Sequence, residues 1–297
     1  MSQIDDLKLK FKRFTIIEKL IVINIVVFVS FYLLNTFAFL FNASSGFLMD
    51  WFVFPKEFSS FLTQPWSIVT YAFLHSGLWH IASNMIILYF SGRYFVSYLT
   101  GKRVLTVYFL GAVFGALFFM LSYNFFPAFS GTGDVPLLGA SASVMAILIA
   151  TATYIPNMSI RLMFIGSIKF WWIAAFFVIM DLIQIPASNA GGHIAHLGGA
   201  LFGYLYASQL KKGNDIGSWF EKLMDGVVSL FKPRKKSPLK TVHKAKKPRN
   251  TAKTTTSSTT KNPNQAQIDA ILDKISKSGY DSLTKQEKDF LFKAGKD

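Results

Sequence analysis

The sequence predicts an all-α membrane protein: a bundle of six transmembrane helices, then a disordered tether and a small helical C-terminal module. Of its 297 residues, 52% are apolar and only 16% are charged, against roughly 25% charged residues in ordinary soluble domains. Mean hydropathy is +0.36 although the last third of the chain is visibly polar. The apolar residues must therefore form long runs in the first two thirds. Cysteine is absent, which excludes disulfide frameworks, thiolate metal sites and cysteine nucleophiles.

Six apolar runs come close to the roughly 20 residues that a helix needs to cross a bilayer. They lie at residues 20–41, 73–90, 104–123, 138–155, 170–185 and 194–210. The first run is too long for the apolar region of a cleavable signal peptide, and no small-residue cleavage site follows it. We therefore expect it to remain as a span.

The basic residues between these runs predict an orientation, because Lys and Arg gather on the cytoplasmic side of a membrane. Ten of them fall on one side and one, Lys56, falls on the other. The ten are Lys8, Lys10, Lys12, Arg13, Lys19, Arg93, Lys102, Arg103, Arg161 and Lys169. This alternation supports six spans with both termini in the cytoplasm, and outward-facing segments at residues 42–72, 124–137 and 186–193.

The parts outside the spans follow from composition. We predict a cytoplasmic N-terminal segment at residues 1–19, the six-span domain at 20–210 and an amphipathic juxtamembrane segment at 211–231. Residues 232–264 are mostly Lys, Pro, Thr and Ser, which predicts a disordered linker. Residues 265–297 predict two short helices, with Gly279 ending the first and a capping box of Thr284 and Glu287 starting the second.

The tail is also strongly basic, with 20 Lys and Arg against 9 Asp and Glu from Lys211 onward. A basic block directly after a membrane region favours contact with anionic lipid headgroups. A nucleic-acid partner is not expected, because no aromatic residues interleave with the basic ones between Lys232 and Lys261.

Polar side chains inside membrane spans are costly and mark functional sites. Four histidines lie in or beside the spans: His75 and His80 at the start of the second, and His193 and His196 at the start of the sixth. Both spans enter from the outer side, so the four imidazoles are expected at similar depth. This placement indicates a site near the outer face.

The fourth span opens with Gly139, Ala140 and Ser141. Ser141 then lies in the first turn of a helix, where free N–H groups and the helix dipole favour a developing anion. A nucleophile suits this position. The alternative is that Ser141 and Ser143 are small packing residues, which is a common use of serine in membrane helices.

Two further pairs of residues support a site. His80 and Asn84 lie one turn apart on one helix face and can direct N–H donors at an oxyanion, or else hold the bundle through an interhelical hydrogen bond. Gly199 and Gly203 follow His196 at a spacing that lets two helix backbones approach closely. Such an approach can bring the His196 ring within reach of a serine on the neighbouring helix.

These segments together, Gly139-Ala-Ser141, His196-Leu-Gly-Gly199-x3-Gly203 and His75-x4-His80-x3-Asn84, resemble the signatures of rhomboid intramembrane serine proteases of bacterial type. The resemblance implies Ser141 as nucleophile, His196 as general base, and His80 and Asn84 in the oxyanion hole. It implies single-pass membrane proteins as substrates, a location in the bacterial cytoplasmic membrane and no cofactor. His75 and His193 are expected at the rim of the site or along a path for water. The sequence leaves the oligomeric state open.

The chain departs from the family's common pattern at Ser67, Ala142 and Met145, none of which removes a reacting group. Asp181, the only acidic residue well inside a predicted span, is a possible third member of the catalytic set. A metal site built from the histidines is a weaker alternative, because the HExxH pattern is absent. A non-catalytic rhomboid-like protein that binds membrane segments is the other alternative, and such relatives characteristically lose the serine or the histidine.

Overall fold

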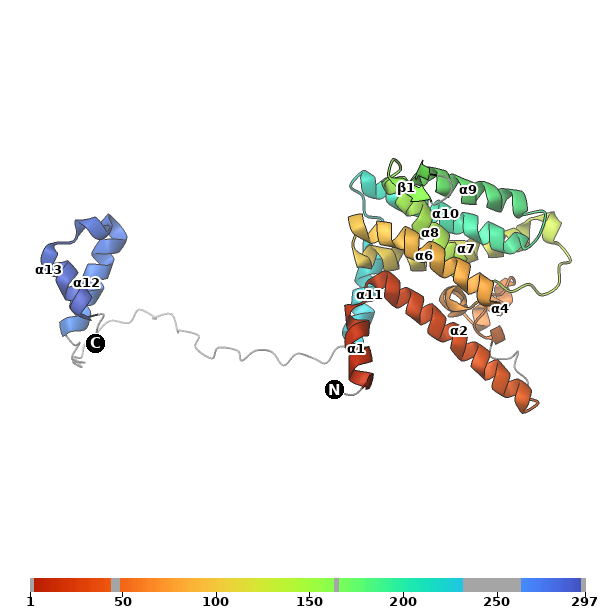
Figure 1. Cartoon of the computed structure of the whole chain (residues 1–297), viewed down its shortest axis with the longest axis horizontal. Helices are drawn as coiled ribbons and strands as arrows, with labels where there is room; N and C mark the ends of the chain where they lie inside the picture. The colour runs from red at the N-terminus through yellow and green to blue at the C-terminus, as the bar shows by residue number, and fades with distance from the viewer. Residues whose placement is uncertain (1–2, 44–48, 163–165, 232–262, 295–297) are drawn as a thin grey trace, which may run out of the picture. The chain divides into compact units, whose positions relative to one another are not determined.

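The computed structural model describes residues 3–43, 49–162, 166–231 and 263–294, and the chain divides into two compact units, residues 1–233 and 234–297. The first unit is a helical bundle (Figure 1). Its helices are α1 (Gln3–Arg13), α2 (Ile16–Leu40), α4 (Phe58–Thr63), α5 (Ser67–Thr70), α6 (Leu78–Tyr98), α7 (Gly101–Phe125), α8 (Ser141–Tyr154), α9 (Phe170–Gln184), α10 (Ala190–Lys211) and α11 (Ser218–Phe231), with 3-10 turns at Tyr71–Phe73 and Pro127–Phe129.

Each of the six predicted spans coincides with a helix, from α2 to α10, and the all-α character of the bundle is confirmed. Among the described residues, two helices, α2 and α7, are long and apolar enough to cross a membrane by length and composition. The number of spans therefore stays a prediction. Helix α8 begins three residues later than its apolar run, and its 14 residues extend only about 21 Å.

One short element differs from the all-helical expectation. Strands β1 (Ser159–Leu162) and β2 (Gly166–Lys169) pair antiparallel in the segment between α8 and α9. The sequence analysis treated this segment only as a loop carrying Arg161 and Lys169. Alternation of β-branched and polar residues on both sides of a glycine is a hairpin signal, and Gly166 has a φ of 88°.

Helix α8 is the centre of the bundle. Residues 142–152 are buried without interruption, and α8 packs against α6, α7, α9 and α10. Figure 1 shows α2 and α9 at opposite edges of this group. Helix α2 buries only one face, formed by Ile17, Leu20, Asn24 and Phe28. Most of its other apolar side chains are exposed, as a lipid-facing helix requires.

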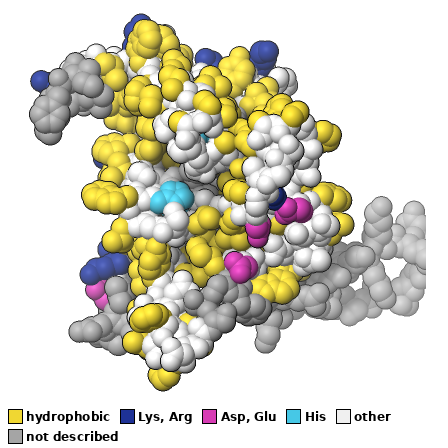
Figure 2. Space-filling view, turned by 90° about the vertical axis from the view of Figure 1, so that its right-hand side faces the viewer, with side chains coloured by type: hydrophobic (Ala, Val, Ile, Leu, Met, Phe, Trp, Pro, Cys, Tyr) yellow, Lys and Arg dark blue, Asp and Glu magenta, His cyan; other side chains and the backbone are white. Residues whose placement is uncertain are grey.

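The end of the bundle that lies at the right of Figure 1 carries the loops that the sequence analysis predicts to face outward. Figure 2 shows that hydrophobic side chains cover much of this face, that a histidine side chain is visible among them, and that acidic side chains gather on one part of it. Hydrophobic side chains also remain exposed along α6 and α9, such as Ile86 and Phe176. The surface composition is that of a protein embedded in lipid.

Helices α8 and α10 meet backbone to backbone. A Cβ added at Gly199 would collide with the carbonyl oxygen of Ala142, and one added at Gly203 would collide with that of Ala146. Because both contact positions advance by four residues, the two helices run parallel with matched turns. The glycines thus fix the height of α10 against α8.

We expect Gly199→Ala to destabilise the bundle, because its new methyl group meets backbone that cannot move aside. Overpacking of this kind costs about 1–3 kcal/mol. The midpoint of thermal unfolding in detergent should fall. Gly226→Ala on α11 is the matched control, since nothing lies within 4 Å of its added Cβ, and it should leave the midpoint unchanged or raised. Equal midpoints for the two variants would contradict the close approach.

Helix α11 follows α10, and two ion pairs join this region to the start of α7. Arg103 pairs at 2.9 Å with Asp215, which lies just before α11, and Lys102 pairs at 2.6 Å with Asp225 of α11. Trp219 and Leu223 of α11 are more than half exposed, whereas Phe220 is partly buried against the bundle. Helix α11 lies within residues 211–231, where the sequence predicts an amphipathic juxtamembrane segment, and its place at the membrane stays a prediction. The predicted linker at residues 232–264 lies almost wholly outside the described residues.

The second unit consists of α12 (Pro263–Ser278), a 3-10 turn (Tyr280–Ser282) and α13 (Lys285–Ala294). Gly279 takes a φ of 78° between the helices. Glu287 accepts from the backbone N–H of Thr284 at 2.7 Å, which forms the predicted capping box. Glu287 also pairs with Lys274 of α12 at 2.9 Å, so one carboxylate links both helices.

We expect this link to weaken in acid. The ammonium of Lys274 and the hydrogen bonds from Thr284 lower the pKa of Glu287 from 4.5 to about 2. A lowered pKa means that the stabilisation is complete above the ordinary pKa and is lost as the pH falls toward the folded-state value. Hydrogen-exchange protection of α12 and α13, corrected for intrinsic rates, should drop between about pH 4.5 and pH 2. Glu287→Gln should lose protection already at neutral pH, and Asp289→Asn should not; unchanged protection in Glu287→Gln would contradict the assignment.

Candidate functional site

A cavity of about 570 Å³ opens among α6, α8, α9 and α10 and the segment at residues 135–138. Its lining includes all four residues that the sequence analysis placed in a reaction, His80, Asn84, Ser141 and His196. These residues come from three different helices. The fold therefore brings them to one hollow.

Ser141 is the first residue of α8, and the backbone just before it makes a turn that requires a glycine. Gly139 has a φ of 126°, which residues with a side chain rarely adopt, and its N–H donates to the carbonyl of Tyr71 at 2.9 Å. The first intrahelical bond of α8 runs from Val144 N–H to Ala140 O. The N–H groups of Ser141, Ala142 and Ser143 therefore have no carbonyl within the helix to bond.

His80 lies directly beside this turn. A Cβ built at Gly139 would be 2.8 Å from His80 Nε2 and 3.5 Å from Ser141 Oγ, so the imidazole occupies space that only a glycine leaves open. The Ser76 N–H points at His80 Nδ1 at 3.4 Å. Because Nδ1 is then the acceptor, a neutral ring carries its hydrogen on Nε2. That N–H faces the serine turn, and the sequence analysis did not foresee the part that Ser76 plays.

Asn84 is one turn further along α6 and is 5% exposed. One of its amide hydrogens bonds to the carbonyl of His80 at 2.9 Å, which fixes the side chain against its own helix. The amide lines the cavity and keeps a second N–H for a ligand. His80 and Asn84 thus present two donors on one face of α6.

His196 is held by Asp181 across two helices. Its Nδ1 lies 2.8 Å from Asp181 Oδ1, and His193 Nδ1 lies 2.7 Å from the same oxygen. An ionised carboxylate only accepts, so each facing Nδ1 carries a hydrogen and each Nε2 keeps its lone pair. The three side chains lie at the α9–α10 contact, and Asp181 itself is 6% exposed.

The two expected rim histidines occupy different places. His193 lines the cavity but is only 9% exposed, because it turns inward to Asp181 instead of toward solvent. His75 is 2% exposed and is not among the cavity-lining residues. Its ring packs edge-on to His80 with 5.1 Å between centroids, so it supports His80 from behind.

Ser141 and His196, the predicted nucleophile and base, are not hydrogen-bonded to each other. Within the described part of the chain, the Ser141 hydroxyl makes no hydrogen bond, and Ser141 and His196 face the same cavity. Catalytic hydrogen bonds are often long without substrate and shorten when it binds. The packing of α10 on α8 at Gly199 and Ala142 sets the height of His196 relative to Ser141.

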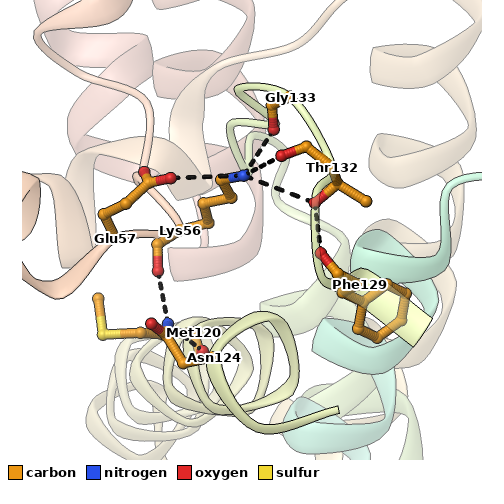
Figure 3. A network of polar contacts seen from close by, with 7 residues as sticks. All are labelled: Lys56, Glu57, Met120, Asn124, Phe129, Thr132 and Gly133. Carbon is orange, nitrogen blue, oxygen red and sulfur yellow. Dashed lines mark hydrogen bonds and ion pairs between the residues drawn. The ribbon is translucent and has the colours of Figure 1, made fainter. Parts of the chain in front are cut away.

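The two segments that the sequence analysis predicts to face outward, at residues 42–72 and 124–137, are joined by a network of polar contacts around Lys56 (Figure 3). Lys56 donates through Nζ to the carbonyl oxygens of Thr132 and Gly133 and pairs with Glu57 at 3.4 Å. Asn124 in turn donates to the Lys56 carbonyl at 2.9 Å. The sequence analysis identified Lys56 only as the one basic residue on the outer side.

A second fastening lies next to it. Phe54 and Leu137 exchange two backbone hydrogen bonds of 2.9 and 2.8 Å. Leu137 lines the cavity, while Pro136 lines both this cavity and a second one of about 530 Å³ near Lys56. These contacts hold residues 135–138 as an extended segment that leads into Gly139 and Ser141.

Three of the described residues are arranged to hold a cation. The ligand atoms of Asp181, His193 and His196 all lie within 4.8 Å of one another. Carboxylate oxygen and imidazole nitrogen are the donors that Zn²⁺ takes in proteins. Two chemistries therefore meet in one cavity: a serine turn with donors beside it, and an Asp–His–His cluster.

Comparison with known proteins gives consistent matches. A rhomboid domain family matches residues 62–212, and a family of unknown function, DUF6576, matches residues 257–293. The chain is 28% identical over 191 residues to RHOMBOID-like protein 12, mitochondrial, of Arabidopsis thaliana, covering 58% of this chain and 57% of the relative. It is 33% identical over 145 residues to Presenilin-associated rhomboid-like protein A, mitochondrial, of Danio rerio, covering 47% of this chain and 36% of the relative.

A third relative is Rhomboid protein 1, mitochondrial, of Saccharomyces cerevisiae, at 27% identity over 176 residues, or 56% of this chain and 47% of the relative. The matched region spans less than two thirds of each relative's own length. The rhomboid domain match at residues 62–212 contains the α6, α8 and α10 segments that form the cavity.

Proposed function

Because the chain belongs to the rhomboid family, we propose that it is an intramembrane serine endopeptidase that hydrolyses peptide bonds in or near transmembrane segments of other membrane proteins. The observation that carries the proposal is the convergence of Ser141, His196 and the two donors on α6 in one cavity. Membership of the family supports a protease-like hydrolase, and these side chains are the groups that such a reaction needs.

The reaction starts with the Ser141 hydroxyl. His196 Nε2 takes its proton, and the oxygen attacks the carbonyl carbon of the scissile bond. The resulting oxyanion is stabilised by the Nε2–H of His80, the amide of Asn84 and the free backbone N–H of Ser141. His196 then gives its proton to the leaving amine. In the second half of the reaction, His196 takes a proton from water, the water oxygen attacks the acyl carbon, and the Ser141 oxygen leaves with the proton from His196.

Asp181 acts on His196 as a positioning residue. By accepting from Nδ1 at 2.8 Å, it holds the tautomer whose Nε2 can serve as a base, and its charge stabilises the imidazolium that forms. The sequence analysis named Asp181 only as a possible third member. The structure adds that Asp181 Oδ1 contacts the Nδ1 atoms of both His196 and His193.

The proposed setting is a lipid bilayer, with single-pass proteins as substrates and no nucleic acid. The chain is a membrane protein, as its relatives and its two long apolar helices indicate. The distribution of Lys and Arg supports both termini on the inner side, which is the cytoplasm if the chain is of bacterial type. The relatives named above are mitochondrial.

The test is cleavage of a single-pass reporter by the full chain in liposomes. We expect the wild-type protein to cut the reporter in or near its membrane segment, and His196→Ala to lose cleavage, because the variant lacks the proposed general base. His243→Ala, in the tail, is the matched control and should cut normally. A wild-type protein that binds the reporter without cutting it would favour the alternative, a rhomboid-like protein that binds membrane segments.

A further inference from the structure

We propose that Asp181, His193 and His196 form a binding site for a divalent cation of the Zn²⁺ type, and that occupation of this site inhibits the peptidase. The inhibitory part rests on the proposed function, whereas the binding part does not. The cluster includes His196, the proposed general base, and it opens into the same cavity as the serine turn.

The donor geometry fits a small tetrahedral ion. Bonds of about 2.0–2.2 Å to Zn²⁺ place neighbouring ligand atoms roughly 3.3–3.6 Å apart. The two Nδ1 atoms lie 2.7 and 2.8 Å from Asp181 Oδ1, so each has to move away from it by about 0.5–0.9 Å. His193 and His196 are three residues apart on α10, a spacing at which two imidazoles reach one point.

The carboxylate has capacity left for a cation. Asp181 Oδ2 is buried and has no hydrogen-bond partner among the described residues. No Lys or Arg pairs with Asp181 in the part of the chain that the structure describes. A buried carboxylate with one oxygen unpaired is costly, and a divalent ion would supply both the missing partner and the missing charge.

The site is also open to an ion and to a fourth ligand. All three side chains line the cavity, so a hydrated cation can approach from it. Three protein donors leave one tetrahedral position for water. The arrangement is that of an accessible site and not of a closed structural one.

A cation bound at this site would prevent His196 from acting as the general base, because it would change the tautomer of the imidazole ring. A cation on His196 Nδ1 leaves the hydrogen of a neutral ring on Nε2, moved there through water. Nε2 then donates and has no lone pair with which to take the Ser141 proton. The expected inhibition lowers kcat and leaves KM unchanged, because the substrate-binding walls are untouched.

The binding test uses the full chain with a tag that contains no histidine and with Ser141→Ala, which removes turnover. Co²⁺ serves as a spectroscopic stand-in, and Zn²⁺ displaces it. We expect one equivalent of Co²⁺ with the visible bands of tetrahedral nitrogen and oxygen coordination. His193→Gln and Asp181→Asn should each weaken binding by at least about 10- to 100-fold, and His243→Gln should not.

Unaltered binding in both site variants, or no binding by a folded protein, would overturn the proposal. Thermal unfolding of each variant without metal shows whether it is folded. In the activity arm, Zn²⁺ should inhibit the wild-type protein reversibly with EDTA, and His193→Gln should be less sensitive relative to its own metal-free rate. An active wild-type protein that binds the ion without inhibition would refute the inhibitory role, while a protein inactive even with EDTA would refute the proposed function and leave the binding result standing.

Discussion

Ser141→Ala is expected to abolish cleavage of the membrane reporter. Loss of the nucleophile in a serine protease costs on the order of 10⁶ in kcat, which is below detection for most reporters. The loss is expected because Ser141 follows the Gly139 turn, lies beside His80 and lines the cavity in which the substrate would react. Binding of the uncut reporter should persist, since the cavity walls are unchanged.

Ser143→Ala is the matched control for this experiment. Ser143 lies two residues further along α8, is fully buried and does not line the cavity. We expect this variant to cut the reporter at close to the wild-type rate. Full activity in Ser141→Ala, or loss of activity in Ser143→Ala alone, would show that the nucleophile is assigned to the wrong serine.

Asp181→Asn is expected to lower kcat by roughly 10²–10⁴ while KM stays close to the wild-type value. An asparagine can present its amide N–H to His196 Nδ1, which favours the tautomer with hydrogen on Nε2. Loss of the correct tautomer in a Ser–His–Asp triad costs about 10⁴. The expected loss of kcat can be smaller here, because His196 can change tautomer by exchanging protons with water in the cavity.

The matched control is Gln184→Ala, which alters another cavity-lining side chain of α9. It should change KM more than kcat. If Asp181→Asn left kcat unchanged, Asp181 would be a packing residue. If it lowered the unfolding midpoint together with kcat, the rescue to examine is Asp181→Glu, which restores the carboxylate and should recover part of kcat.

The positions of the main helices could be predicted because a bilayer demands long apolar runs. The six predicted segments differ from α2, α6, α7, α8, α9 and α10 by a few residues at most ends. The largest shifts are at α6, where polar residues such as Arg93 extend the helix beyond the apolar run. Backbone hydrogen bonding continues there, whereas the hydropathy signal does not.

Two features of the site could not be predicted from spacing. The sequence shows Asp181 twelve and fifteen residues before the two histidines, in a different helix, and only the α9–α10 contact brings its Oδ1 between them. The orientation of His193 follows from the same contact. A polar residue in a lipid-facing helix is costly unless it is paired, which was the available signal.

The loops over the cavity were the least predictable part. Lys56, Asn124 and Gly133 are far apart along the chain, and their hydrogen bonds depend on how the two outer segments meet. By contrast, the turn at Gly139 could be anticipated, because a glycine directly before a serine at a helix start is a local signal.

The most direct test of the central claim is to label the wild-type protein in liposomes with a serine-reactive fluorophosphonate and to locate the adduct by mass spectrometry. The account predicts one covalent adduct, on the Oγ of Ser141, and no labelling when His196 is replaced by alanine. An adduct on another serine, or labelling that is unaffected by His196→Ala, would contradict it.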